Sequence, residues 1–192
     1  MSNAWKFQEN FQPKELADIN EYIYTTGSIA LSNYKKVIEV DNKVVSFLFG
    51  FNEKLSVPSH DFQKIGSKLS LLKTIMMIKN MSFFDKFRMI KATFVHEMNK
   101  AKLVKHGSSE IFLFVTDPEY QGKGYGQILF EGFVKNCKDM GVEIIHIETN
   151  TLGASSFYER VDCVHKGDFF SPLHAYTTKG GQACVYTFKI EV

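Results

Sequence analysis

The sequence predicts one domain of mixed α/β architecture, with helices packed on a mixed sheet. The chain has 192 residues, which is enough for one sizeable core and short for two. Stretches rich in β-branched and aromatic residues alternate with stretches of helical periodicity, an order typical of this class. Its 44% apolar and 23% charged residues are ordinary for a globular protein. We therefore expect a single domain over residues 1–192.

The first part of the chain predicts a helix and then a β-hairpin. Residues 13–24 carry apolar side chains at helical spacing. Tyr34–Val40 and Lys43–Phe51 are rich in β-branched and aromatic residues, and Asp41 and Asn42 between them suit a tight turn.

A long segment, about residues 53–109, separates this hairpin from the next predicted strand, Glu110–Thr116. It is too long for an unstructured loop in a compact domain. Apolar side chains recur on two helical faces, formed by Ile65, Leu69, Leu72 and Met76 and by Phe83, Phe87, Ile90, Phe94 and Met98. We expect a helical insertion of two or three helices, packed on the sheet or over its open end.

The insertion is also basic. Residues 53–108 hold 11 Lys and Arg against 4 Asp and Glu. This charge suits an acidic acceptor substrate, an acidic protein partner, an anionic membrane surface, or simply a solvated helix face. The basic residues are dispersed and no RNA-binding motif accompanies them, so no nucleic acid partner is expected.

The last third of the chain predicts further helices and strands. A helix over residues 126–139 and a strand over residues 142–149 follow Glu110–Thr116. A short helix over residues 154–161 and two strands, near 164–170 and 182–191, complete the domain.

A glycine-rich turn joins the strand Glu110–Thr116 to the helix that follows. Gly122, Gly124 and Gly126 free the backbone there, so that successive N–H groups can converge on one point. The positive end of the helix dipole adds to the same point. The turn therefore predicts a site for an anion, and phosphate is the usual one.

The glycine spacing distinguishes among phosphate loops. A dinucleotide or kinase loop needs its third glycine at residue 127, which is Gln127, and a P-loop needs Gly-Lys-Ser or Gly-Lys-Thr, which the chain lacks. The segment from Gln121 to Gly126 instead resembles the Q/R-x-x-G-x-G/A motif of the GCN5-related N-acetyltransferase (GNAT) family.

A second stretch extends the resemblance, which covers about residues 110–163. Asn150 follows the strand over residues 142–149, and the sequence Ala-Ser-Ser-Phe-Tyr ends at Tyr158, much as in the second motif of the family. The family usually closes this motif with Gly-Phe, whereas this chain has Asp162 and Cys163. Because Asp tolerates the left-handed conformation, the helix can still end there.

The resemblance implies a GNAT sandwich, with the helical insertion placed before the central strand, and acetyl-CoA as co-substrate. The family holds pantetheine beside its splayed central strand and pyrophosphate on the glycine loop. The implied acetyl-CoA residues are Phe114, Val115, Thr116, Gln121, Gly122, Lys123, Gly124, Tyr125, Gly126, Asn150 and Ser155.

Two residues are expected to move protons. Tyr158 occupies the family position that protonates the departing thiolate, and its phenol is protonated at neutral pH. Glu110 occupies the position at which relatives that modify protein lysines carry a base. Asp117, His146 and Glu148 are alternatives to Glu110.

The leading hypothesis is an N-acetyltransferase in which an amine attacks acetyl-CoA directly in a ternary complex. The acceptor would be a small-molecule or peptide amine, with its identity open, as is the oligomeric state. One alternative is a non-catalytic module that binds acyl-CoA or a partner. A more remote one is a transferase that uses the loop for ATP.

The cysteines and the hydropathy bear on the compartment. Cys137, Cys163 and Cys184 form no pair with disulfide or metal spacing, so we expect buried thiols, no metal site and a reducing, cytoplasmic location. No apolar run approaches the roughly 20 residues that span a bilayer.

Overall fold

The structure is a computed structural model that describes residues 21, 25–55, 72–73, 75–77, 81–105, 108–151, 155–173 and 182–191. The elements named below belong to this part of the chain. The predicted helix over residues 13–24 lies almost wholly outside the described residues, as do Ile65, Leu69 and Ala154.

The predicted hairpin is confirmed. Strands β1 (Tyr34–Val40) and β2 (Lys43–Phe51) pair antiparallel, with Val40 opposite Lys43. Asp41 and Asn42 form the turn with φ of 51° and 61°, the positive values that a two-residue hairpin turn requires.

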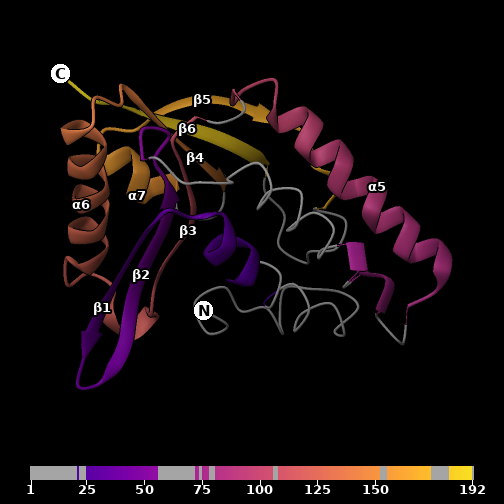
Figure 1. Ribbon diagram of the computed structural model, residues 1–192, viewed down its shortest axis with the longest axis horizontal. Helices are drawn as coiled ribbons and strands as arrows, with labels where there is room; N and C mark the ends of the chain where they lie inside the picture. The colour runs from indigo at the N-terminus through magenta and orange to yellow at the C-terminus, as the bar shows by residue number, and fades with distance from the viewer. Residues whose placement is uncertain are drawn as a thin grey trace.

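Six strands form one mixed sheet in the order β1-β2-β3-β4-β6-β5 (Figure 1). The remaining strands are β3 (Glu110–Thr116), β4 (Ile144–Asn150), β5 (Val164–Phe169) and β6 (Ala183–Lys189). Only β3 and β4 pair in parallel; each other neighbouring pair is antiparallel. The predicted mixed α/β class is confirmed.

The helices lie on both sides of this sheet. Helix α6 (Tyr125–Asp139) and the short α7 (Ser155–Arg160) lie on one side, and α5 (Phe83–Lys100) lies on the other (Figure 1). The 3-10 turn η1 (Pro118–Tyr120) leads from β3 into the glycine-rich turn. Asp162 ends α7 with φ of 60°, so this residue does adopt the left-handed conformation.

The main core lies between the sheet and α6. It is built from buried side chains of the sheet and the two helices on that side, among them Leu48, Ile111, Phe130, Phe133, Ile147 and Tyr158. A smaller cluster on the other face joins Val104, just after α5, to Phe169, Ala183 and Val185. Cys137, Cys163 and Cys184 are buried and unpaired, as expected.

The insertion does contain a helix on the sheet, but the face that α5 buries is not the apolar face noted in its sequence. Its buried residues are Met89, Ala92 and His96. The predicted apolar face points away from the sheet: Phe83, Phe87, Phe94 and Met98 are exposed. In the short helical stretch before it, Ile75 is buried while Leu72 and Met76 are exposed.

Polar partners decide how α5 sits, as the charged cluster described below shows. No helix among the described residues is long and apolar enough to cross a membrane.

Candidate active site

The glycine-rich turn has the geometry of an anion cradle. Gly122 and Gly124 adopt φ of 75° and 83°, which few other residues adopt, and a Cβ built on either would meet no atom within 4 Å. Gly124 is also the N-cap of α6 and offers no side chain to cap it. The space before the first turn of α6 is therefore open.

The backbone amides of this turn are free to bind a ligand. Ile128 donates to the Gly124 carbonyl oxygen at 3.0 Å, which is the first bond of the helix. For the N–H groups of residues 122–127, the described part of the chain supplies no acceptor. Six unpaired donors at the positive end of a helix favour an anion.

Side chains around the turn hold its shape. Gln121 donates from Nε2 to the Thr116 carbonyl oxygen at 3.2 Å, which ties the turn back to β3. The Lys123 ammonium lies 4.5 Å from the centre of the Tyr120 ring, and Tyr125 stands beside the same ring. Lys123 is thus at the exposed tip, where it adds positive charge to the cradle.

The sheet opens next to this turn. Strands β3 and β4 are in register only at Glu110 with His146 and at Ile111 with Ile147. Beyond that point, Phe114, Val115 and Thr116 pair with β2 alone, so their other edge has no strand partner among the described residues. An extended amide chain could add to this edge as a strand would.

The other predicted residues near the opening lie on β4 and α7. Asn150 is the last residue of β4, and Ser155 begins α7 with its hydroxyl donating to the Thr151 carbonyl oxygen at 3.2 Å. Tyr158 is only 4% exposed, and its ring packs on Phe157 and Tyr186. Burial raises the pKa of Tyr158, so its phenol remains protonated.

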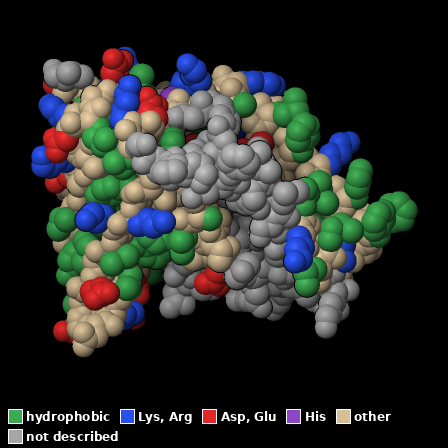
Figure 2. Space-filling model, in the orientation of Figure 1, with side chains coloured by type: hydrophobic (Ala, Val, Ile, Leu, Met, Phe, Trp, Pro, Cys, Tyr) green, Lys and Arg blue, Asp and Glu red, His purple; other side chains and the backbone are tan. Residues whose placement is uncertain are grey.

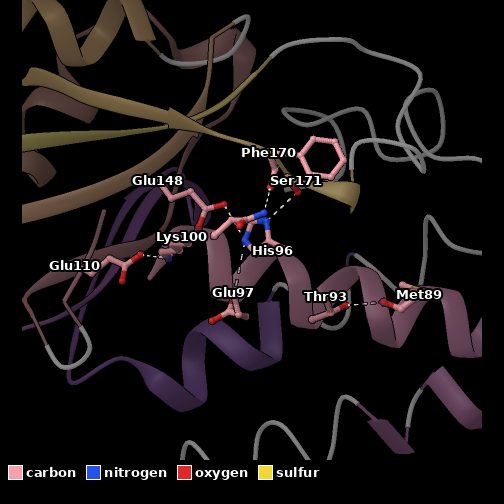
Figure 3. Close-up of polar contacts among 10 residues, drawn as sticks. Met89, Thr93, His96, Glu97, Lys100, Glu110, Glu148, Phe170 and Ser171 are labelled. Carbon is pink, nitrogen blue, oxygen red and sulfur yellow. Dashed lines mark hydrogen bonds and ion pairs between the residues drawn. The ribbon is translucent and has the colours of Figure 1, made fainter. Parts of the chain in front are cut away.

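A charged cluster occupies the opposite face of the sheet, where β3 and β4 begin to separate (Figure 3). Lys100 of α5 pairs with Glu110 of β3 and, at 2.9 Å, with Glu148 of β4. His96, one helical turn earlier, places Nε2 3.2 Å from Glu148. The insertion therefore delivers two basic side chains to two carboxylates of the sheet.

A hydroxyl group fixes the other side of the His96 ring. Nδ1 lies 2.8 Å from the Ser171 hydroxyl oxygen, in a hydrogen bond whose direction depends on the tautomer. The ring also packs edge-on against Phe169. Together with Glu148, these contacts hold the imidazole in one orientation.

The two carboxylates of this cluster differ in basicity. Burial raises the pKa of Glu110, and the charge of Lys100 only partly opposes this. Burial also acts on Glu148, but Lys100 and the hydrogen bond from His96 outweigh it and hold the pKa of Glu148 well below its usual range. Glu110 is therefore the stronger base of the two.

The cations of the cluster are stabilised in their charged forms. Burial alone would lower the pKa of Lys100, but the charges of Glu110 and Glu148 raise it above its ordinary value. For His96, burial alone would likewise lower the pKa, but the hydrogen bond to Glu148 helps to raise it above its ordinary value.

His146 lies directly opposite Glu110 in the parallel pair. It is buried, and its Nδ1 atom has no hydrogen-bond partner in the part of the chain that the structure describes. Burial, with the charges of Lys166 and Lys100, lowers the pKa of His146 to about 4. The imidazole is therefore neutral at neutral pH.

Asp117, another alternative base, lies apart from the cluster at the start of η1. Its carboxylate pairs with Lys43 at 3.0 Å, and this contact lowers the pKa of Asp117. A carboxylate held in this way accepts a proton poorly.

Sequence reasoning did not find His96 and Lys100 as members of the site. A signal was present, since the two lie four residues apart and therefore share a helix face with Met89 and Ala92. The five apolar residues on the other face concealed it, because an apolar stripe is the usual sign of the buried side.

One group of side chains has the composition of a metal site. His165, Asp168 and Cys184 place ligand atoms within 4.8 Å of one another. The Cys184 thiol donates to the Thr149 carbonyl oxygen at 3.7 Å, and burial raises its pKa to about 11. It is thus protonated and is not prepared for a metal.

The opening between β3 and β4 and the glycine-rich turn beside it together define a class of fold. Comparison with solved structures supports this fold class. A protein from Desulfovibrio desulfuricans, assigned to the GNAT acetyltransferases, superposes with a TM-score of 0.50 at 13% identity, over 94% of this chain and 84% of its own. This similarity shows the fold.

Other solved structures have similar coverage. The ribosomal-protein-S18-alanine N-acetyltransferase of Escherichia coli has a TM-score of 0.49 at 13% identity, over 88% of this chain and 77% of its own. The Salmonella typhimurium protein yncA, solved with acetyl-CoA, has a TM-score of 0.47 at 10% identity, over 92% and 75%. No curated protein matches the sequence.

The sequence model of the acetyltransferase (GNAT) family matches residues 87–162, from within α5 to just beyond α7. This match spans less than half of the chain.

Proposed function

We propose that this protein transfers the acetyl group of acetyl-CoA to a primary amine by direct attack in a ternary complex. The observation that carries the proposal is the set of unpaired N–H groups over residues 122–127, at the positive end of α6. They suit the pyrophosphate of coenzyme A. Gln121, Lys123 and Tyr125 frame this cradle.

The thioester would then lie in the opening between β3 and β4. Pantetheine pairs with the free edge of Phe114, Val115 and Thr116, and backbone N–H groups there polarise the thioester carbonyl. Asn150 and Ser155, at the end of β4 and the start of α7, bind the coenzyme from the other side of the opening.

Two proton transfers complete the reaction. The amine nitrogen attacks the thioester carbon, the C–S bond breaks, and the amine proton passes to Glu110 directly or through water. Tyr158 gives its proton to the departing thiolate. The raised pKa of Glu110 supports this choice of base, because Asp117 and Glu148 are held as weaker bases and His146 is weaker than an ordinary histidine.

The alternative function is a module that binds acyl-CoA or a partner without turnover. The observation that favours it is the pairing of Glu110 with Lys100, because the Lys100 ammonium already occupies the carboxylate that would serve as the base. For turnover, the acceptor amine must compete with Lys100 for this carboxylate or reach it through water.

The donor site is tested by calorimetric binding of acetyl-CoA, with ATP as a comparison ligand. Gly124→Ala strains a left-handed residue by about 1–2 kcal/mol and should weaken acetyl-CoA binding. Gly141→Ala is the matched control, since Gly141 has φ of 72° and the same open surroundings at the other end of α6. Equal affinities of the two variants, or tighter binding of ATP, would contradict the donor site.

Turnover is tested by release of coenzyme A with a panel of primary amines. Tyr158→Phe should lower kcat by about 100-fold and leave acetyl-CoA affinity unchanged. Tyr186→Phe is the control, because this neighbouring tyrosine is also buried and its hydroxyl bonds to Glu159. If no amine releases coenzyme A from a protein that binds acetyl-CoA, the non-catalytic module is correct.

A further inference from the structure

Helix α5 is amphipathic, but its polar groups face the sheet and its large apolar side chains face outward. Its inward side is formed by Met89, Ala92, His96 and the paired Lys100. On the outward side, five large apolar side chains are between 54% and 80% exposed: Phe83, Phe84, Phe87, Phe94 and Met98. We call these five residues the aromatic face.

The charged cluster prevents α5 from turning this face inward. A rotation of the helix would remove His96 and Lys100 from Glu148 and Glu110, and it would leave the buried Glu110 and the half-buried Glu148 without these partners. The aromatic face therefore stays outward in the folded chain. An apolar patch of this kind on a water-exposed surface marks an interaction site.

A second helical stretch enlarges the apolar surface. Leu72, Met76 and Met77 are between 39% and 68% exposed. The Lys86 ammonium of α5 donates to the Met76 carbonyl oxygen at 2.9 Å, which joins the two segments. Figure 2 shows apolar side chains gathered along the edge of the molecule over α5, with Lys and Arg among them.

The polar residues of this region are mainly basic. The exposed basic side chains of the described residues between 72 and 105 are Lys73, Arg88, Lys91, Lys102 and Lys105. The acids of the same stretch are Glu97, which is exposed, and Asp85, which lies 3.8 Å from Arg88. By helical spacing, Lys91 lies between Met98 and Phe84 at the margin of the aromatic face, and Arg88 lies just beyond Phe84.

We propose that the aromatic face docks the protein on an anionic lipid surface, with Arg88 and Lys91 at the level of the headgroups. Phenylalanine side chains on one helix, flanked by Lys and Arg, are the features of an interfacial helix. The charge argues against a second copy as the occupant, because a symmetric dimer through this face would bring like charges together. The inference does not depend on the proposed transfer reaction.

The test is co-sedimentation of the full chain with vesicles of phosphatidylcholine, alone or with about one third phosphatidylserine. The wild type should bind the anionic vesicles, less so at high salt. Phe87→Ser with Phe94→Ser should weaken this binding about tenfold or more. Arg88→Gln with Lys91→Gln should weaken it on anionic vesicles alone.

Val164→Ser is the control, since Val164 is a 61% exposed apolar residue of β5 and not of the aromatic face, and this variant should bind as the wild type does. Far-UV circular dichroism and the melting temperature establish that the variants fold, and acetyl-CoA binding is measured separately. Three results would overturn the proposal. The first is no binding to anionic vesicles, and the second is an equal loss of vesicle binding in the Val164→Ser control. The third is that dimerisation, or binding of polyglutamate as an acidic peptide, needs Phe87 and Phe94 while vesicle binding does not.

Discussion

Lys100 and His96 lie on α5, whose outer side is exposed, and their side chains pair with carboxylates on β3 and β4. Lys100 is largely buried, with 15% of its side chain exposed, and it contacts both Glu110 and Glu148. Such a group stabilises the fold chiefly by preventing an uncompensated charge. Its role in the fold can therefore be separated from any role of Glu110 in catalysis.

We predict that Lys100→Met destabilises the protein by about 3–5 kcal/mol, because Glu110 then remains buried without a counter-charge and Glu148 keeps only His96 as a partner. Urea unfolding at neutral pH measures this. The matched control is Lys102→Met, whose exposed ammonium bonds only to Asn99 among the described residues and whose loss should change the free energy of unfolding by about 0.5 kcal/mol or less. Equal effects of the two substitutions would contradict the cluster.

The cluster also predicts a pH dependence. Since the folded pKa of Glu148 lies below its unfolded value of about 4.3, its stabilising contribution is present above that pH and is lost as the pH falls through the folded pKa. The free energy of unfolding of the wild type minus that of Glu148→Gln should therefore shrink between about pH 6 and about pH 3.

The protonation of His96 decides which pH range suits the comparison of the wild type with Glu148→Gln. In the wild type, Glu148 raises the pKa of His96, so His96 is protonated below about pH 6 and changes the wild-type free energy of unfolding little over the acid range. Glu110 works in the opposite direction to Glu148, since its pKa is raised, and it is present in both proteins compared. A difference that grows on acidification would show that Glu148 is not held as a carboxylate.

Among the elements, β2 shows how a sequence detail sets the packing of the sheet. The pairing of β2 with β3 shifts register between Phe49 and Gly50. A Cβ on Gly50 would lie 2.9 Å from a Phe133 ring carbon and 3.2 Å from the Glu110 carbonyl oxygen. The missing side chain thus lets α6 approach the sheet at the start of β3, where Glu110 is placed.

We predict that Gly50→Ala destabilises the protein by about 1–3 kcal/mol, because Phe133 is fully buried and cannot move aside without strain. Gly27→Ala is the control of opposite sign. Gly27 is helical and a Cβ added to it would meet no atom within 4 Å, so alanine should stabilise the protein by up to about 1 kcal/mol. Thermal and urea unfolding of both variants provide the comparison.

In the whole molecule, the charged cluster links the insertion to the centre of the sheet. Lys100 and His96 reach from α5 to β3 and β4, and Val104 packs with Phe169 in the smaller apolar cluster (Figures 1 and 3). Polar and apolar contacts thus fasten the insertion at two places, and we propose that residues 1–192 form one domain.

A single domain should unfold in one cooperative transition. Urea unfolding followed by far-UV circular dichroism reports on helices, including α5, and tyrosine fluorescence reports on the core around Tyr158 and Tyr186. We expect the two curves to coincide. An earlier loss of helical signal would show that the insertion unfolds as a separate unit.

Local sequence predicted the strands and the glycine turn well, because their determinants are local. The limits of β1, β2 and β3 agree with those expected, and the hairpin turn follows from Asp41 and Asn42. Gly122 and Gly124 predicted a backbone that L-residues with side chains rarely adopt, and both have positive φ. The roles of Tyr158 and Glu110 stay predictions.

The sequence by itself determined the glycine turn and its free amides, since a glycine turn before a helix exposes the same amides wherever it lies. Only the tertiary structure decided which side of α5 is buried. Pairing of Lys100 with Glu110 and Glu148 joins residues from three separate elements, and helical periodicity contains no information about such partners. Because an unpaired buried carboxylate costs more than an exposed phenylalanine, charge pairing placed the polar side inward and left the aromatic face outside.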